Sequence, residues 1–99
     1  MDALASILPG LMQKLGLEAG TRGWRAVTEW PALAGERIAR RTRATGFRDG
    51  VVTVEVDGSA WMHELSFLEP ELVRRANQLL GAGTVRGVRF VLARGGIQR

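Results

Sequence analysis

Residues 48–57, which read RDGVVTVEVD, carry the strongest fold signal in the sequence. An Asp-Gly pair between two β-prone segments predicts a tight hairpin, here joining strands at residues 43–47 and 51–57. In the second strand, valines at positions 52, 54 and 56 alternate with Thr53 and Glu55, so one face is apolar and the other polar. The hairpin therefore predicts a sheet with one buried and one solvated face.

Helical patterns precede the hairpin. A first helix is expected over residues 6–15, with Gly16 as its stop. A second helix is expected to start at Thr21, a residue type that caps helices, and to reach Trp30. Pro31 should kink or break that helix, and residues 32–42 form a further helical stretch before the first strand.

A longer helix and a last strand follow the hairpin. Ser59 can cap this helix, which contains Pro70, so we expect either a kink or two helices in series. Its expected buried stripe consists of Trp61, Leu65, Leu68, Leu72, Ala76 and Leu79. Residues 85–93 predict the last strand, with Arg89 on the face opposite Val88 and Phe90.

The order helix, helix, strand, strand, helix, strand predicts a two-layer α+β sandwich with a three-stranded sheet. The length of 99 residues suits a single domain, with a core at about residues 4–93 and a frayed end at residues 94–99. The hairpin makes the first two strands antiparallel. The pattern leaves the direction of the third strand open.

Composition argues against a catalytic or membrane role. The sequence has no cysteine and a single histidine, so neither a metal cluster nor a catalytic triad is expected, and no cofactor is predicted. His63, which precedes Glu64, is expected to be a surface residue without a catalytic role. No apolar run is long enough to cross a membrane. We expect a non-enzymatic cytoplasmic protein without a small-molecule substrate.

The charge is strongly segregated along the chain. Residues 37–48 contain five arginines and no acid, residues 49–71 contain six acids and no Lys or Arg, and residues 72–99 contain six arginines and no acid. The first basic set is Arg37, Arg40, Arg41, Arg43 and Arg48. It could bind phosphates, or it could be a solvated face that pairs with the acidic segment.

Two further features suggest nucleic-acid binding, each with an ordinary alternative. The second basic set is Arg74, Arg75, Arg86, Arg89 and Arg94. Within it Arg89 should be exposed on the sheet, where it could stack on bases or simply protect an edge strand. Residues 20–23 match the GxxG loop that clamps nucleic-acid backbones, although a helix stop followed by a cap explains them better.

Several apolar or small residues are candidates for either packing or a protein contact. Trp30 and Trp61 are expected to anchor the core, with a partner-facing role as the alternative. Phe67 falls outside the tightest apolar stripe and should be partly exposed. Gly35 lies inside a predicted helix, where close packing would compensate its low helix propensity.

Three blocks of the sequence, taken in order, resemble one known family. They are residues 30–39, which read WPALAGERIA; residues 50–65, which read GVVTVEVDGSAWMHEL; and residues 77–90, which contain NQLLG and VRGVRF. This combination is similar to the DciA family of bacterial proteins, and the similarity spans about residues 4–92.

The resemblance implies a KH-like fold and a role in chromosome replication, with binding to single-stranded DNA and to the DnaB-type replicative helicase. In that role, Arg37, Arg40, Arg41, Arg43 and Arg48 would hold phosphates, assisted by Arg89. Helical surfaces around Trp30, Glu64 and Phe67 would contact the helicase. Two alternatives stay open: a KH-like RNA-binding module, and a protein-interaction domain without nucleic-acid affinity.

Overall fold

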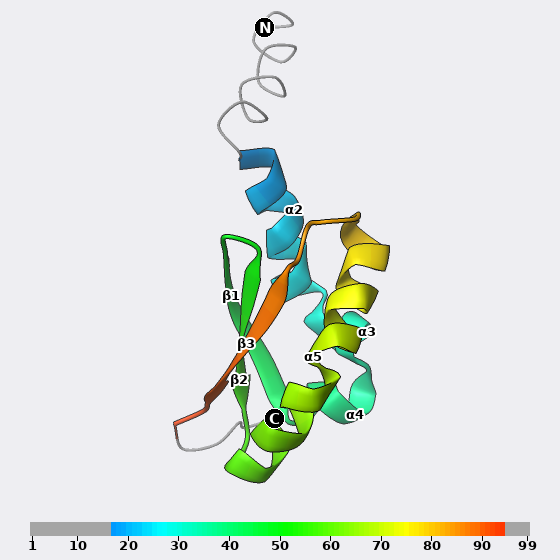
Figure 1. Cartoon of the computed structure of the whole chain (residues 1–99). Helices are drawn as coiled ribbons and strands as arrows, with labels where there is room; N and C mark the ends of the chain where they lie inside the picture. Colours follow the sequence, from blue (N-terminus) through cyan, green and yellow to red (C-terminus); the bar gives the residue numbers. More distant parts are fainter. Residues whose placement is uncertain (1–16, 95–99) are drawn as a thin grey trace, which may run out of the picture.

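The computed structural model describes the backbone of residues 17–94 and side chains from residue 21, so the helix expected at residues 6–15 lies outside the described part. The described elements are helices α2 (Leu17–Thr28), α3 (Trp30–Ala34) and α4 (Glu36–Ala39), strands β1 (Thr42–Arg48) and β2 (Val51–Val56), helix α5 (Ser59–Leu80) and strand β3 (Gly87–Leu92). Their order confirms the predicted α+β architecture (Figure 1).

The three strands form a mixed sheet in the order β1-β2-β3. β1 and β2 are antiparallel, and the turn residues Asp49 and Gly50 have positive φ angles of 52° and 81°, as a tight hairpin turn requires. β3 is parallel to β2, because α5 returns the chain to the same end of the sheet. In β1 the register shifts between Ala44 and Gly46, so Thr45 is the extra residue of a β-bulge.

One face of the sheet is covered by helices and the other is open. The predicted alternation in β2 is confirmed, since Val52, Val54 and Val56 are buried while Thr53 and Glu55 remain partly exposed. Apolar residues of α2, α3 and α5 join Val52 and Val54 in one core. Figure 1 shows the sheet as one layer, with α3, α4 and α5 packed along its side.

Trp30 is the largest side chain of this core, with only 2% of its surface exposed. Its indole Nε1–H donates a hydrogen bond to the hydroxyl of Thr42, with 2.8 Å between the nitrogen and the oxygen. A buried indole N–H needs such a partner. Of the two roles considered for Trp30, the structure therefore supports the core anchor.

Helix α2 differs from the prediction at both ends. It includes Thr21 well inside its length, so Thr21 is not its N-cap, and residues 20–23 are helical instead of forming a loop. The break expected at Pro31 falls earlier, at Glu29, and Pro31 occupies the first turn of α3. Proline is tolerated there because the first-turn N–H groups have no partner within the helix.

The expected continuous helix at residues 32–42 is wrong. Gly35 has a φ of +91° and separates α3 from α4, and α4 ends at Ala39, before Thr42 begins β1. An added Cβ at Gly35 would meet nothing within 4 Å. The glycine is thus explained by backbone conformation and not by the close packing that we expected.

Helix α5 is one uninterrupted helix that contains Pro70, which excludes two separate helices in series. Its N-cap is Gly58 and not Ser59. Leu68 and Leu79 were expected in the buried stripe, but they are 40% and 46% exposed. The stripe instead passes through Leu65, Leu72, Ala76 and Leu80, which keeps to one side of the helix over four turns.

Candidate functional site

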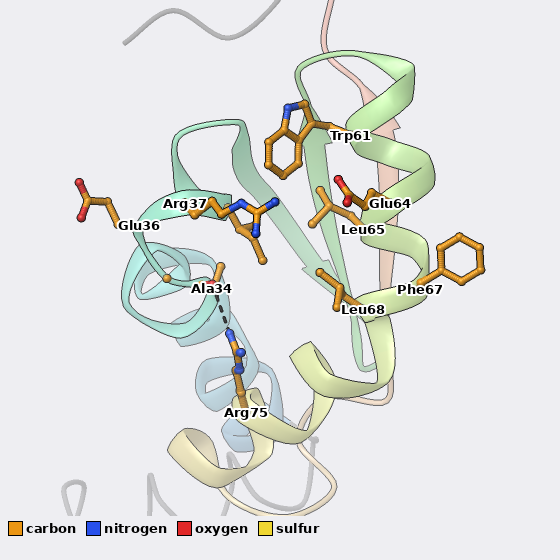
Figure 2. A pocket seen from close by; sticks show the side chains of 11 residues that line it. Ala34, Glu36, Arg37, Trp61, Glu64, Leu65, Phe67, Leu68 and Arg75 are labelled. Carbon is orange, nitrogen blue, oxygen red and sulfur yellow. Dashed lines mark hydrogen bonds between the residues drawn. The ribbon is translucent and has the colours of Figure 1, made fainter.

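A groove separates the α3–α4 turn from the first half of α5, with a volume of about 520 Å³. We call it the helical groove. Its apolar lining is Ala34, Ile38, Trp61, Leu65, Phe67 and Leu68, and its other lining residues are Gly35, Glu36, Arg37, Glu64 and Arg75. Figure 2 shows the Trp61, Leu65 and Leu68 side chains pointing from α5 toward α3 and α4. The groove thus joins several residues that the sequence assigned to a protein contact.

Trp61 lies at one end of the helical groove between two arginines. The guanidinium carbons of Arg37 and Arg41 lie 5.5 Å and 6.0 Å from the centre of its ring, within the range of cation–π attraction. A second hollow of about 390 Å³, lined by Glu36, Arg37, Arg40, Arg41 and Trp61, continues the groove here. Trp61 is half-buried, so it belongs to the groove wall and is not the fully buried core anchor that we expected.

Most arginines of the first basic set are paired with carboxylates. Arg40 binds Glu36 at 2.6 Å and Arg41 binds Asp57 at 3.3 Å. Arg43 binds Glu55 on the neighbouring strand, with 3.0 Å between its Nε and the carboxylate oxygen. These are solvent-exposed pairs of the kind that the ordinary interpretation predicted, and each contributes little to stability.

Arg37 is the exception within this set. It forms no ion pair with any residue in the described part of the chain, and its charge faces Trp61 across the helical groove (Figure 2). Glu36, its neighbour, points away from the groove. The sequence predicted an arginine face here, and within it Arg37 differs from Arg40, Arg41 and Arg43, which pair with carboxylates.

A second candidate surface lies at the hairpin end of the open sheet face. We define it by Arg48, Arg86 and Arg89 and call it the sheet surface. Arg48 is almost fully exposed and lies 3.8 Å from the adjacent Asp49, while Arg86 and Arg89 form no ion pair within residues 21–94. Arg48 of β1 and Arg89 of β3 lie on opposite sides of β2. Arg48 pairs with Val51 of β2, and Thr53 of β2 pairs with Gly46 on one side and Arg89 on the other.

The sheet surface is therefore a shallow platform with cations on both sides. The aliphatic part of Arg86 covers Gly50 of the hairpin turn, where a Cβ would lie 2.8 Å from its Cγ. Arg86 belonged to the second basic set, but only the parallel pairing of β3 with β2 places it beside the hairpin. The sequence showed that Arg86 belongs to a basic set. It did not show the direction of β3, which determines where Arg86 lies.

The remaining predicted residues occupy different environments. Phe67 is 73% exposed, as expected, and its ring contacts His63 edge-on with 5.1 Å between centroids. In Figure 2 the Phe67 ring points away from the groove interior. Glu64 lies on the α5 wall and is exposed. Trp24 is also exposed.

Arg75 closes the far end of the helical groove. Its guanidinium donates a hydrogen bond to the carbonyl oxygen of Ala34 at 3.3 Å, which ties α5 to the end of α3 (Figure 2). Glu71 accepts hydrogen bonds from both Arg74 and Arg75. The Arg74 hydrogen bond is the main cause that lowers the pKa of Glu71 to about 2, with Arg75 adding to it against a smaller opposing effect of desolvation.

The described residues offer no site for a clamp or a metal. Because residues 20–23 lie within α2, the GxxG-loop interpretation is wrong for this chain. Among residues 17–94 no three His, Asp or Glu side chains gather as metal ligands. No helix in the same part is long and apolar enough to cross a membrane.

The fold defines a small α+β domain with two candidate functional surfaces. The chain belongs to the DciA family, because the family model described as "Dna[CI] antecedent, DciA" matches residues 3–90. This is a replication accessory family associated with helicase loading. The family resemblance seen in the sequence is thus confirmed, and the match includes all three blocks that carried it.

Curated relatives support this assignment. A UPF0232 protein of Streptomyces avermitilis is 34% identical over 86 residues, which cover 85% of this chain and 48% of the relative. A UPF0232 protein of Mycolicibacterium paratuberculosis is 31% identical and covers 73% of this chain and 44% of the relative. The chain therefore spans less than half the length of these relatives.

Proposed function

We propose that this chain is a non-enzymatic, KH-like replication module that binds single-stranded DNA and contacts the replicative helicase to promote its loading. The family assignment supports the replication role. The observation that carries the DNA-binding part is the sheet surface, where exposed arginines face solvent with little or no carboxylate pairing. Arginines of this kind can bind phosphates most favourably, because no internal ion pair has to be broken first.

Single-stranded DNA is the form of nucleic acid that we propose for this surface. Between Arg48 and Arg89 the open sheet face carries Gly46, Thr53 and Val51, so unpaired bases can lie on the sheet between the two cations. Arginine side chains can contact phosphates and also stack on unpaired bases. Arg37, Arg40, Arg41 and Arg43 would contribute a weaker, longer-range attraction, because three of these four already bind carboxylates.

The salt dependence of binding tests this proposal. Three phosphate contacts predict that log affinity for single-stranded DNA falls with log salt at a slope of about −2. The double variant Arg48→Glu with Arg89→Glu should lose about tenfold or more in affinity. A matched control, Arg25→Glu with Arg74→Glu, makes the same change in net charge at arginines that pair with Glu29 and Glu71.

Three outcomes decide the matter. If the control variant weakens DNA binding as much as the sheet-surface variant does, the loss of affinity comes from net charge. That result would contradict a DNA-binding site at the sheet surface. A salt-independent affinity would contradict phosphate binding altogether. Equal or tighter binding of matched RNA would favour the RNA-binding alternative, although the helical GxxG segment removes its proposed loop. Direct binding to the purified replicative helicase, measured without DNA, tests the second half of the proposal.

A further inference from the structure

The helical groove has the shape of a trough and not of a compact pocket. The hollow of about 520 Å³ is continued by one of about 390 Å³ beyond Trp61. Along α5, Trp61 and Leu68 are separated by two helical turns, or roughly 10 Å. An elongated trough of this kind suits a segment of polypeptide better than a small ligand.

Part of the exposed apolar surface of the molecule lies along this trough. Leu68 is 40% exposed and Trp61 is half-buried, and both side chains point into the groove (Figure 2). Between them Leu65 is fully buried and contributes to the wall from below. Contiguous apolar side chains that remain open to solvent mark a protein-interaction site when polar residues surround them, as they do here.

Charge identifies the kind of occupant. Arg37 is the groove cation without an ion pair in the described chain, whereas Arg75 already binds Glu71 and the Ala34 carbonyl. A carboxylate of the occupant can pair with Arg37 without displacing an internal partner. The groove is lined by Glu36 and Glu64 as well as by Arg37 and Arg75, so it has no excess of positive charge to attract a phosphate backbone.

We infer that the helical groove binds an amphipathic α-helix of a protein partner, with apolar side chains on Trp61 and Leu68 and a carboxylate on Arg37. Apolar residues four and seven positions apart on such a helix match the spacing of the α5 side chains that they would meet. The inference is independent of DNA binding on the sheet surface, and it rests on the proposed function only in requiring a protein partner.

Selection from a random peptide library tests the chemistry directly. We would immobilise the full chain and select displayed peptides of about 16 residues, which is roughly four helical turns. The expected consensus has apolar residues at helical spacing and an Asp or Glu close to one of them. Enriched peptides without an apolar stripe, or no enrichment at all, would overturn the inference.

Variants then locate the binding. Leu68→Ser should weaken a selected peptide by about tenfold or more, whereas Leu79→Ser should not. Both leucines are similarly exposed on α5, and Leu79 is not among the residues that line the groove. Arg37→Glu should weaken peptide binding more than it weakens DNA binding, and Arg89→Glu should weaken DNA binding more than peptide binding. Equal effects of Leu68→Ser and Leu79→Ser would overturn the assignment.

A competition with the purified replicative helicase separates this inference from the proposed function. Displacement of the peptide by helicase supports both. Peptide binding that depends on Leu68 while helicase neither binds nor competes would leave the groove inference standing and contradict the proposed partner. A dimer of this chain that Leu68→Ser dissolves would assign the groove to a second copy and overturn the inference.

Discussion

Trp30 and Thr42 form a buried hydrogen bond that joins the first short helix to the first strand. The indole Nε1–H donates to the Thr42 hydroxyl at 2.8 Å, and this hydroxyl donates in turn to the carbonyl oxygen of Ile38 at 2.7 Å. The Thr42 side chain of β1 therefore forms hydrogen bonds with both α3 and α4. Since α3 and α4 form one wall of the helical groove, this chain of bonds also fixes the position of that wall.

Thr42→Val should destabilise the protein by about 1–3 kcal/mol, because it preserves the shape of the side chain and leaves the buried indole N–H without its acceptor. The measurement is the free energy of unfolding from urea denaturation. Thr42→Ser keeps the hydroxyl and should recover most of the loss. Thr45→Val, at an exposed position on the same strand, is the matched control, and an equal loss there would contradict the argument.

Gly35→Ala should cost roughly 1–2 kcal/mol, since the residue adopts a φ of +91° that an L side chain rarely adopts. No atom lies within 4 Å of the added Cβ, so the cost is purely conformational. Gly46→Ala is the matched control, because its Cβ is equally unobstructed and no positive φ is recorded there. Thermal unfolding of both variants measures the difference, and equal melting temperatures would refute the conformational explanation.

Gly23→Ala should destabilise the protein for a different reason. Its Cβ would clash with ring atoms of Phe47, so the ring or the helix has to shift. Phe47→Leu in the same chain should relieve part of the clash, so the double variant should lose less than the two single losses combined. A double-mutant cycle on the free energies of unfolding measures this coupling. Strict additivity would show that the contact is absent in solution.

Glu71 should make stability depend on pH in acid. The Arg74 and Arg75 hydrogen bonds lower its pKa from 4.5 to about 2 in the folded chain. A lowered folded-state pKa contributes stability above the unfolded-state value, and this contribution disappears as the pH falls from about 4.5 to 2. The stability difference between the wild type and Glu71→Gln should therefore shrink over that interval. A difference that stays constant across it would contradict the prediction.

The sequence predicted the sheet better than it predicted the short helices. Alternating valines and an Asp-Gly turn are local signals, and the structure follows both of them. The break at Gly35 was missed because a glycine within a helical pattern is compatible with either a continuous helix or a reversal of φ. The burial of Trp30, Leu33 and Ala34 of α3 in the core decides between the two.

Contacts between distant segments explain the other omissions. Glu69 accepts a hydrogen bond from the Val88 N–H at 2.8 Å and so protects the outer edge of β3, although 19 positions separate the two residues. The exposure of Leu68 has the same origin. The helical repeat predicted that Leu68 lies in the buried stripe. The buried side of α5, however, is determined by its contacts with the sheet and α3, and Leu68 lines the groove beside those contacts.

The β-bulge at Thr45 affects both layers of the molecule at once. Strict alternation along β1 would turn Phe47 outward and Arg48 inward, whereas the extra residue turns Phe47 toward Gly23 of α2 and leaves Arg48 in solvent. A chain that lacks Thr45 would pair as a regular strand and keep both orientations. At this point the strand can change length by one residue without exchanging its faces, so its loss should spare both the α2 contact and the charge of the sheet surface.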